Sequence, residues 1–370
     1  MKNIDFERIF SSIPEGIYIL NKDAKIIYWN QEAENILGFT ENEVLGKSCS
    51  DNIIMHCDSK NNKLCNTDKC IYRKIMKNSL SIRQQYNYAH HRSGEKIILE
   101  TTAFPYYDKR GEISGIIEIF HKVDPKTVSE ISYSKKFMNK ILPKGTMNFD
   151  RIRIFSKYIP RSFIGGDFYN FFKNDNQIIF WFGDCESEGV SASLISVMLN
   201  SIISMKKQYI KIDNLSKIMA DINNDFCDIS ENSVSASMIL GVFDCKTGKI
   251  TYTNAGHPEI IHYSKKKDSI TLYSLNSFLL GFAKNSSFQI KTIDTSKNDL
   301  IFMFSDGAYE FKISKDDYFS IEGLTEIIES SIHSSEKTDE ILENCVDRLS
   351  ENNFETNFLD DFTMCMMEIK

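Results

Sequence analysis

The chain has 370 residues, of which 42% are hydrophobic and 26% are charged, and its net charge is -7. This composition is typical of soluble globular proteins and excludes a largely disordered chain, while the length predicts two or three domains. A mildly acidic protein has no general electrostatic attraction to nucleic acid or to anionic membranes, so we expect neither as a partner.

The segment Met1–Glu7 carries two acidic residues and no long apolar run, so we expect no signal peptide. We also find no continuous apolar stretch of the ~18 residues that a membrane-spanning helix needs. The sequence therefore predicts a cytoplasmic protein. In that compartment we do not expect the nine cysteines to form a structural disulfide set.

Residues 6–123 predict a compact α+β unit. Gly16–Leu20 and Lys25–Asn30 are rich in β-branched and aromatic residues and flank a turn, which favours a hairpin. The other expected elements of this unit are short helices at 32–37 and 41–45 and strands at 84–89, 96–104 and 115–120.

Three ordered segments carry a resemblance to a known family. Ile13–Leu20, Ile27–Glu34 and Leu37–Lys47 together resemble a PAS sensor domain. The resemblance implies a PAS fold over about a third of the chain and a sensing role. It leaves the ligand of the domain unidentified.

Four cysteines and a histidine fall within 22 positions of this unit: Cys49, His56, Cys57, Cys65 and Cys70. The segment resembles a PAS subgroup in which a Cys-x-Asp-Asn-Ile-x-Met-His stretch precedes paired cysteines. A metal, an iron cofactor or a redox thiol pair would use Cys49, His56, Cys65 and Cys70. The alternative is that the cysteines pack as small hydrophobic residues.

Residues 124–145 predict a connecting helix. Apolar residues recur with irregular helical spacing, and Pro143-Lys144-Gly145 should end the helix. The apolar positions are Val128, Ile131, Phe137, Met138, Ile141 and Leu142.

Residues 146–370 predict a second α+β domain, with many antiparallel strands and two pairs of helices. Such a pattern favours an α/β/β/α-layered fold around a central antiparallel β-sandwich. The expected strands are 152–158, 177–182, 237–243, 249–254, 259–263, 269–272, 300–304 and 362–368, and the expected helices are 192–206, 214–226, 321–331 and 336–350.

The second domain repeats one local pattern, in which an apolar strand runs directly into an aspartate, usually beside glycine. The aspartates are Asp167, Asp184, Asp306 and the pair Asp360-Asp361. Converging strand ends would bury strong negative charge, which is costly unless a cation neutralises it. Oxygen ligands without histidine or cysteine favour Mg²⁺ or Mn²⁺. Two such ions, ~3.5–4 Å apart, could bind a phosphate and activate a bridging water molecule. The alternative for each aspartate taken alone is ordinary turn chemistry.

The residues around these aspartates also resemble a second known protein family. Residues from about 135 to 370 resemble the SpoIIE branch of the metal-dependent protein phosphatases, relatives of the eukaryotic type 2C enzymes. The blocks that carry it, in chain order, are Lys140–Pro143, Tyr158–Pro160 with Ile164–Tyr169, Gly183-Asp184 with Gly189–Ala192, Gly241–Asp244 with Tyr252–Pro258, Leu279–Gly281, Phe304–Gly307 and Asp360–Thr363.

The resemblance implies roles for individual residues. Asp184 would be the ligand shared by two Mn²⁺ or Mg²⁺ ions, assisted by the backbone carbonyl of Cys185. Asp306 and Asp360 would complete the inner shell, and Asp167 would bind a metal directly or through water. Asp361 is a weaker candidate for the same set.

This chain departs from the family pattern at Ser187 and Glu188, where glycine and then a histidine or lysine are usual. Ser187 can replace glycine only where the backbone φ is negative or strain is tolerated. Glu188 would weaken the attraction of a phosphate. His257 could act as a general acid, but its place in a turn favours a structural role. Surface roles are favoured for Arg151, Arg153 and Arg161.

The sequence therefore predicts a phosphatase that removes phosphate from serine or threonine under the control of the PAS domain. The resemblance implies a phosphoprotein substrate, typically an anti-sigma-factor antagonist, and a homodimer. Ser187 and Glu188 motivate an alternative from another class, an inactive phosphatase fold that binds a partner protein. A nucleotide cyclase or kinase has no support, because no glycine-rich phosphate-binding loop with lysine is present.

Overall fold

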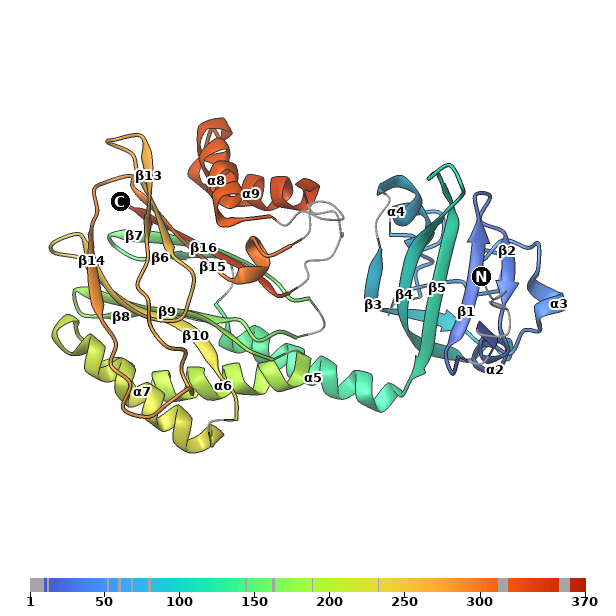
Figure 1. Cartoon of the computed structure of the whole chain (residues 1–370), viewed down its shortest axis with the longest axis horizontal. Coiled ribbons are helices and arrows are strands. Elements are labelled where there is room, and N and C mark those ends of the chain that lie inside the picture. The colour runs from blue at the N-terminus through green and yellow to red at the C-terminus, as the bar shows by residue number, and fades with distance from the viewer. Residues whose placement is uncertain are drawn as a thin grey trace, which may run out of the picture. The chain divides into compact units, whose positions relative to one another are not determined.

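The structure is a computed structural model, and it describes residues 10–11, 13–51, 53–58, 61–67, 69–78, 81–143, 145–161, 164–187, 189–231, 233–311, 319–352 and 360–370. The chain forms two compact units, which meet in the sequence between Glu130 and Ile131 (Figure 1). Each unit has its own hydrophobic core.

The N-terminal unit is built on a five-stranded antiparallel sheet with the strand order β2-β1-β5-β4-β3. The predicted hairpin is confirmed, since Tyr18 of β1 lies opposite Trp29 of β2. The short helix α4 was not predicted, although Ile71, Ile75 and two further hydrophobic residues give its eight residues an amphipathic pattern. The elements are β1 Gly16–Asn21, β2 Ile26–Trp29, α2 Gln31–Leu37, α3 Glu41–Val44, α4 Ile71–Asn78, β3 Ile82–His90, β4 Lys96–Tyr107 and β5 Ile113–Val123.

Asn30 fixes the junction between the hairpin and α2. Its side chain accepts hydrogen bonds from the backbone N–H of Ala33, which caps the helix, and from that of Ile17 in β1. Gly38 ends the same helix with a left-handed φ of 79°. Asn30, which lies in one of the segments that resemble a PAS domain, therefore connects the first turn of α2 to strand β1 of the sheet.

Helix α5 spans Pro125–Ile141 and passes from the first unit into the second. Only part of its apolar stripe is buried: Met138 packs into the core of the C-terminal unit together with Leu142, whereas Phe137 is 55% exposed. The helix ends just before Leu142 and Pro143, as the sequence predicts.

The C-terminal unit is a sandwich of two antiparallel sheets. One has the order β14-β11-β10-β9-β8 and the other β13-β12-β15-β16-β7-β6. The strands are β6 Gly145–Asn148, β7 Ile152–Ile159, β8 Phe168–Asn174, β9 Gln177–Cys185, β10 Ala236–Asp244, β11 Lys249–Ala255, β12 Ile260–Ser264, β13 Ser269–Tyr273, β14 Ile290–Asp294, β15 Leu300–Phe304 and β16 Phe362–Ile369.

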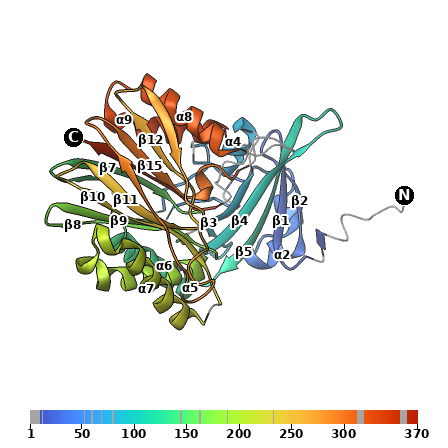
Figure 2. The same ribbon diagram turned by 60° about the vertical axis from the view of Figure 1, so that its left-hand side comes forward.

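Helices cover the outer faces of both sheets. Helices α6 (Gly189–Lys206) and α7 (Leu215–Ser230) pack on β8 to β11, while α9 (Thr338–Asn352) packs on β7 and β16 with α8 (Ile321–Ser334) beside it. Figures 1 and 2 show this order of layers, helices, sheet, sheet, helices. The predicted α/β/β/α arrangement is therefore confirmed.

Three strands of this unit were not predicted: β6, β8 and β14. Each lies at the edge of its sheet. An edge strand buries fewer side chains than a central one, so its sequence shows little alternation between apolar and polar residues. Strands β6 and β14 are mostly exposed, which explains why their residues resemble loops.

Helix α6, with the 3₁₀ turn Lys207–Tyr209 that follows it, is long and apolar enough to cross a membrane by length and composition alone. The sequence pattern did not reveal this, because polar residues interrupt the apolar run. In the structure α6 packs on β8 and β9, and Leu199, Ile202 and Ile203 lie in the core. A buried core helix passes the same test as a membrane span.

Candidate active site

The predicted aspartates lie at one edge of the sandwich, but not all of them follow a strand. Asp184 is the penultimate residue of β9, and Asp306 directly follows Ser305 at the end of β15. Asp167, in contrast, directly precedes β8, and Asp360-Asp361 precede β16. The prediction that every aspartate ends a strand is wrong for these three residues.

Antiparallel pairing nevertheless brings these residues to the same edge. Phe168 at the start of β8 lies opposite Gly183 near the end of β9, and Met364 near the start of β16 lies opposite Phe304 at the end of β15. The start of one strand is therefore beside the end of its neighbour. Asp167 is consequently close to Asp184, and the Asp360-Asp361 pair is close to Asp306.

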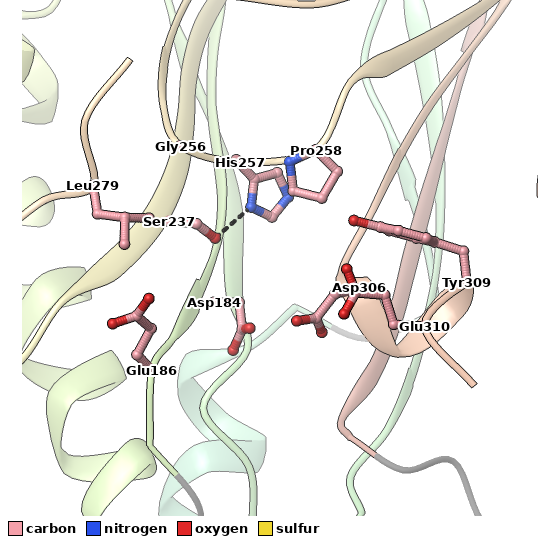
Figure 3. Close-up of a pocket in the computed structure, with 10 residues that line it drawn as sticks. All are labelled: Asp184, Glu186, Ser237, Gly256, His257, Pro258, Leu279, Asp306, Tyr309 and Glu310. Carbon is pink, nitrogen blue, oxygen red and sulfur yellow. Dashed lines mark hydrogen bonds between the residues drawn. The ribbon is translucent and has the colours of Figure 1, made fainter. Parts of the chain in front are cut away.

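A pocket of about 290 Å³ opens between these strand ends. Figure 3 shows Asp184 between Glu186 on one side and Asp306 on the other. Four carboxylates line the pocket, with no lysine or arginine among the lining residues. The full lining is Asp184, Glu186, Ser237, Gly256, His257, Pro258, Leu279, Asp306, Tyr309 and Glu310.

The carboxylates perturb one another. Burial, together with the charges of Asp306 and Asp360, raises the pKa of Asp184 to about 8. Burial and the charge of Asp360 raise the pKa of Asp306 to about 6. Asp167 is fully buried, and burial followed by the charge of Asp184 raises its pKa well above the usual range. A cation at this place would remove the repulsion and favour the ionised forms.

The residues fit a hard divalent cation in part. Buried oxygens of Asp167 and Asp306, in each case Oδ1, have no hydrogen-bond partner among the described residues and could accept a metal ion. Within the described part of the chain, however, no three Asp, Glu, His or Cys side chains are arranged as a finished metal site. Mg²⁺ keeps several water ligands in proteins, so a partial set of carboxylates is compatible with it.

Asp361 holds the loop that leads to Asp167. Its two carboxylate oxygens accept hydrogen bonds from the backbone N–H groups of Arg161 (2.8 Å) and Gly166 (2.6 Å). Thr363 in β16 donates its hydroxyl hydrogen to Asp167 Oδ2. Asp361 therefore positions the site, in line with its weaker candidacy as a ligand.

Gly165 is required by this close packing. A Cβ atom at position 165 would lie 1.9 Å from Asp361 Oδ2. We expect Gly165→Ala to destabilise the C-terminal unit by about 2–3 kcal/mol, the upper part of the range for overpacking a buried site because the clash is severe, as measured by urea unfolding. Gly248→Ala is the control: Gly248 has a left-handed φ of 70° but no atom closer than 3.6 Å, so about 1 kcal/mol is expected. Equal losses in the two variants would contradict the packing argument.

The turn after β9 contains the first departure from the family pattern. Ser187 donates its backbone N–H to the carbonyl of Cys185 (2.6 Å) and is not among the described non-glycine residues with positive φ. Serine therefore replaces glycine there without left-handed strain. Gly189, which begins α6, does have a positive φ of 65°. Glu188 lies outside the described residues.

His257 has structural contacts on both sides. Its Nδ1 lies 2.7 Å from Ser237 Oγ, and its backbone N–H and carbonyl bond the side chain of Asn254. Burial lowers the pKa of His257 to about 3, so the imidazole is neutral. These contacts agree with the structural role favoured from the sequence, although the ring also lines the pocket.

One of the three arginines lies near the acidic cluster. Burial raises the pKa of Asp361, and the hydrogen bond from the Arg161 backbone N–H opposes this rise, with a smaller contribution from the Arg161 charge. Arg153 pairs instead with Glu368 (2.8 Å), at the opposite end of β7, and Arg151 lies two residues before it, just outside that strand. The backbone N–H of Arg161 therefore contributes to the site, while the surface role favoured for its side chain stays a prediction.

Several residues of the pocket wall were not predicted as site residues. Ser237 lies directly opposite Asp184 across β9 and β10, and Tyr309 and Glu310 follow Asp306 after one turn of 3₁₀ helix. The position of Ser237 depends on strand register, which the sequence does not show. The short distance of Tyr309 and Glu310 from Asp306 in the sequence was a signal that could have identified them.

In the N-terminal unit, two of the predicted cofactor residues, Cys49 and His56, lie near the buried carboxylate of Glu118. Tyr18 donates its hydroxyl hydrogen to Glu118, and His56 Nε2 lies 3.3 Å from the other oxygen of Glu118. Burial raises the pKa of Cys49 to about 12, with smaller contributions from nearby Cys65 and Cys70. No group of three potential metal ligands is formed here among the described residues, so the cofactor stays a prediction.

Comparison with known proteins finds a family match for each unit. The family "Stage II sporulation protein E (SpoIIE)" matches residues 174–370, and the PAS fold matches residues 4–123. The chain is 24% identical over 248 residues to phosphoserine phosphatase RsbU of Bacillus subtilis, covering 65% of this chain and 70% of RsbU. It is 21% identical over 229 residues to protein IcfG of Synechocystis, covering 54% of this chain and 35% of IcfG.

Two solved structures share the layered fold. The SiaA-PP2C domain of Pseudomonas aeruginosa aligns with a TM-score of 0.56 and 14% identity, over 66% of this chain and 97% of that domain. The RsbU and RsbW domains of Rv1364c from Mycobacterium tuberculosis align with a TM-score of 0.52 and 18% identity, over 60% of this chain and 64% of theirs. At these identities the alignments establish the fold of the C-terminal unit.

Proposed function

Because this chain belongs to the SpoIIE family and has an N-terminal PAS domain, we propose that it is a metal-dependent protein phosphatase for phosphoserine or phosphothreonine, regulated by that domain. Its homologue RsbU is a phosphoserine phosphatase. The observation that carries the proposal is the acidic pocket, in which Asp184 and Asp306 from different sheets lie close enough to raise the pKa of Asp184.

We propose that the acidic residues hold two Mn²⁺ or Mg²⁺ ions. Asp184 would contact both ions with the Cys185 carbonyl, Asp306 and Asp360 would contribute further oxygens, and Asp167 would bind directly or through water. When bound, such ions lower the pKa of a water molecule and neutralise the charge that develops on a phosphoryl group. A pocket lined by four carboxylates repels phosphate by itself, which supports this requirement for cations.

The other residues of the chain orient these groups. Thr363 fixes the rotamer of Asp167, and Asp361 holds the loop before it. The neutral His257 holds the Ser237 hydroxyl at the pocket wall, opposite Asp184. A volume of about 290 Å³ is sufficient for a phosphorylated serine or threonine side chain, but not for a folded domain.

The proposed organisation assigns residues 6–123 to the sensor, 124–145 to the connecting helix and 146–370 to the phosphatase. Helix α5 would transmit the state of the sensor, because it is continuous between the two units. We further propose a cytoplasmic homodimer whose substrate is a phosphorylated anti-sigma-factor antagonist or a similar phosphoprotein.

A phosphatase assay of the full-length protein tests the proposal. With a serine-phosphorylated protein, phosphate release should require millimolar Mn²⁺ or Mg²⁺ and should stop when EDTA is added. Release that continues at the same rate in EDTA would contradict metal dependence. Binding of the phosphoprotein without any release would favour the alternative, an inactive phosphatase fold that serves as a binding module.

A further inference from the structure

Two exposed phenylalanines lie beside the acidic pocket. Phe278 and Phe282 are 61% and 65% exposed, and both belong to the segment between β13 and β14. Their rings are stacked almost in parallel, with centroids 5.4 Å apart and an interplanar angle of 2°. Paired rings that project into solvent are uncommon on a surface that serves only for solubility.

The segment that carries these rings is anchored on both sides. Leu280 is fully buried and exchanges two backbone hydrogen bonds with Ala236, the first residue of β10. The side chain of Asn223 in α7, itself fully buried, accepts from the N–H of Gly281 and donates to the carbonyl of Ala283. The exposure of the rings is therefore built into the fold, and the aromatic pair is pre-organised.

The aromatic pair is continuous with the pocket. Leu279, the neighbour of Phe278, lines the pocket, and Figure 3 shows it on the same side as Ser237 and Glu186. Leu279 packs directly on the backbone of Gly256, where a Cβ atom would come within 2.6 Å of its side chain. A ligand that fills the pocket and extends past Leu279 would therefore meet the two rings.

The charge of the pocket explains why such a surface is needed. Among the described residues that line the pocket, four are carboxylates (Asp184, Glu186, Asp306 and Glu310) and none is a lysine or arginine that could bind a phosphate. Bound cations would attract any phosphate ester equally and would not distinguish one phosphoprotein from another. Affinity for a particular protein must come from surface outside the pocket, where aromatic side chains contribute most per residue.

We propose that Phe278 and Phe282 form a docking surface for the phosphoprotein substrate, binding an apolar side chain that lies a few residues from the phosphorylated serine or threonine. This inference rests on the proposed function, because it assigns the occupant of the pocket. It specifies the substrate class further: a phosphorylated residue flanked by exposed leucine, isoleucine, valine or phenylalanine.

Binding of defined peptides tests the surface independently of turnover. The probes are two fluorescent 15-residue peptides with a central phosphonate analogue of phosphoserine, which cannot be hydrolysed, flanked by either leucine or asparagine. With full-length protein and Mn²⁺, fluorescence polarisation should show about tenfold tighter binding of the leucine peptide, the effect expected of one or two interface aromatics. In Phe278→Ser/Phe282→Ser this preference should fall to about one.

Tyr209→Ala is the matched control. Tyr209 is an aromatic residue of similar exposure, 68%, beyond the far end of the 18-residue helix α6, roughly 27 Å along that helix. This variant should keep the tenfold preference. The double serine variant should retain the unfolding temperature of the wild type, because the rings it removes are exposed.

Several results would overturn the proposal. One is equal binding of the two peptides by the wild type, and another is a peptide preference that persists in the double variant. The third is a wild-type dimer that becomes a monomer in the double variant, and the fourth is binding of the wild type, but not of the double variant, to phosphatidylglycerol vesicles. The last two results would assign the surface to a second copy of the chain or to a membrane. A tenfold preference without any phosphate release in the separate assay would contradict the phosphatase and retain the docking surface.

Discussion

Asp184→Asn is expected to lower kcat for a phosphoserine substrate by about 10²- to 10³-fold, and Asp306→Asn by a similar factor, the range seen when one pre-organised electrostatic group is removed. Each substitution replaces a carboxylate that would hold a cation with a neutral amide of the same shape. Phosphate release in saturating Mn²⁺ measures the effect. The Mn²⁺ concentration needed for half-maximal rate should also rise.

The control for both variants is Asp294→Asn. Asp294 lies on the edge strand β14, is 81% exposed, and pairs with Lys249, so its loss should leave kcat within about twofold. A second readout separates loss of metal from loss of folding. Asp184→Asn should stabilise the metal-free protein, because it removes one of the mutually repelling carboxylates. A variant that is both inactive and less stable than the wild type would instead indicate damage to the fold.

All central strands of the C-terminal unit could be predicted from the sequence, whereas three of its four edge strands, β6, β8 and β14, could not; the edge strand β13 was predicted. Strands such as β9 and β15 are buried on both faces, so their residues form continuous apolar runs that identify them. Edge strands β6 and β14 lack such runs. Both family resemblances, the PAS domain and the SpoIIE-type phosphatase, rested on motifs in a fixed order along the chain and are confirmed.

The convergence of the aspartates could be predicted only in part. The repeated Asp-Gly pattern indicated which residues would meet, but not that Asp167 and Asp360 precede their strands. The site still forms, because in an antiparallel sheet the first residues of one strand lie beside the last residues of the neighbouring strand. The wall formed by Ser237 and Leu279 depends on register and on a long loop, which no local pattern encodes.

The acidic pocket also predicts how stability depends on pH. In the folded, metal-free protein the pKa values of Asp184 and Asp306 are raised to about 8 and about 6, above the value of about 4 in an unfolded chain. The folded state therefore binds more protons than the unfolded state between these values. Its stability must fall as the pH rises from about 4 to about 8.

Thermal unfolding in EDTA at pH 6 and pH 8 measures this effect. One carboxyl that keeps its proton only in the folded state changes stability by about 1.4 kcal/mol per pH unit, so a loss of about 2 kcal/mol is expected over this interval. For a domain of this size the unfolding temperature should fall by about 5 °C. Stability that is constant or higher at pH 8 would contradict the clustering of ionisable carboxylates.

Divalent ions should reverse the trend. A cation binds the ionised carboxylates of the folded state and not the unfolded chain, so Mn²⁺ at 100 times its dissociation constant adds about 2.7 kcal/mol. Protons compete for the same oxygens, and the stabilisation by 1 mM Mn²⁺ should therefore be larger at pH 8 than at pH 6. In Asp184→Asn both the pH dependence and the response to Mn²⁺ should be reduced, because one residue would carry both effects.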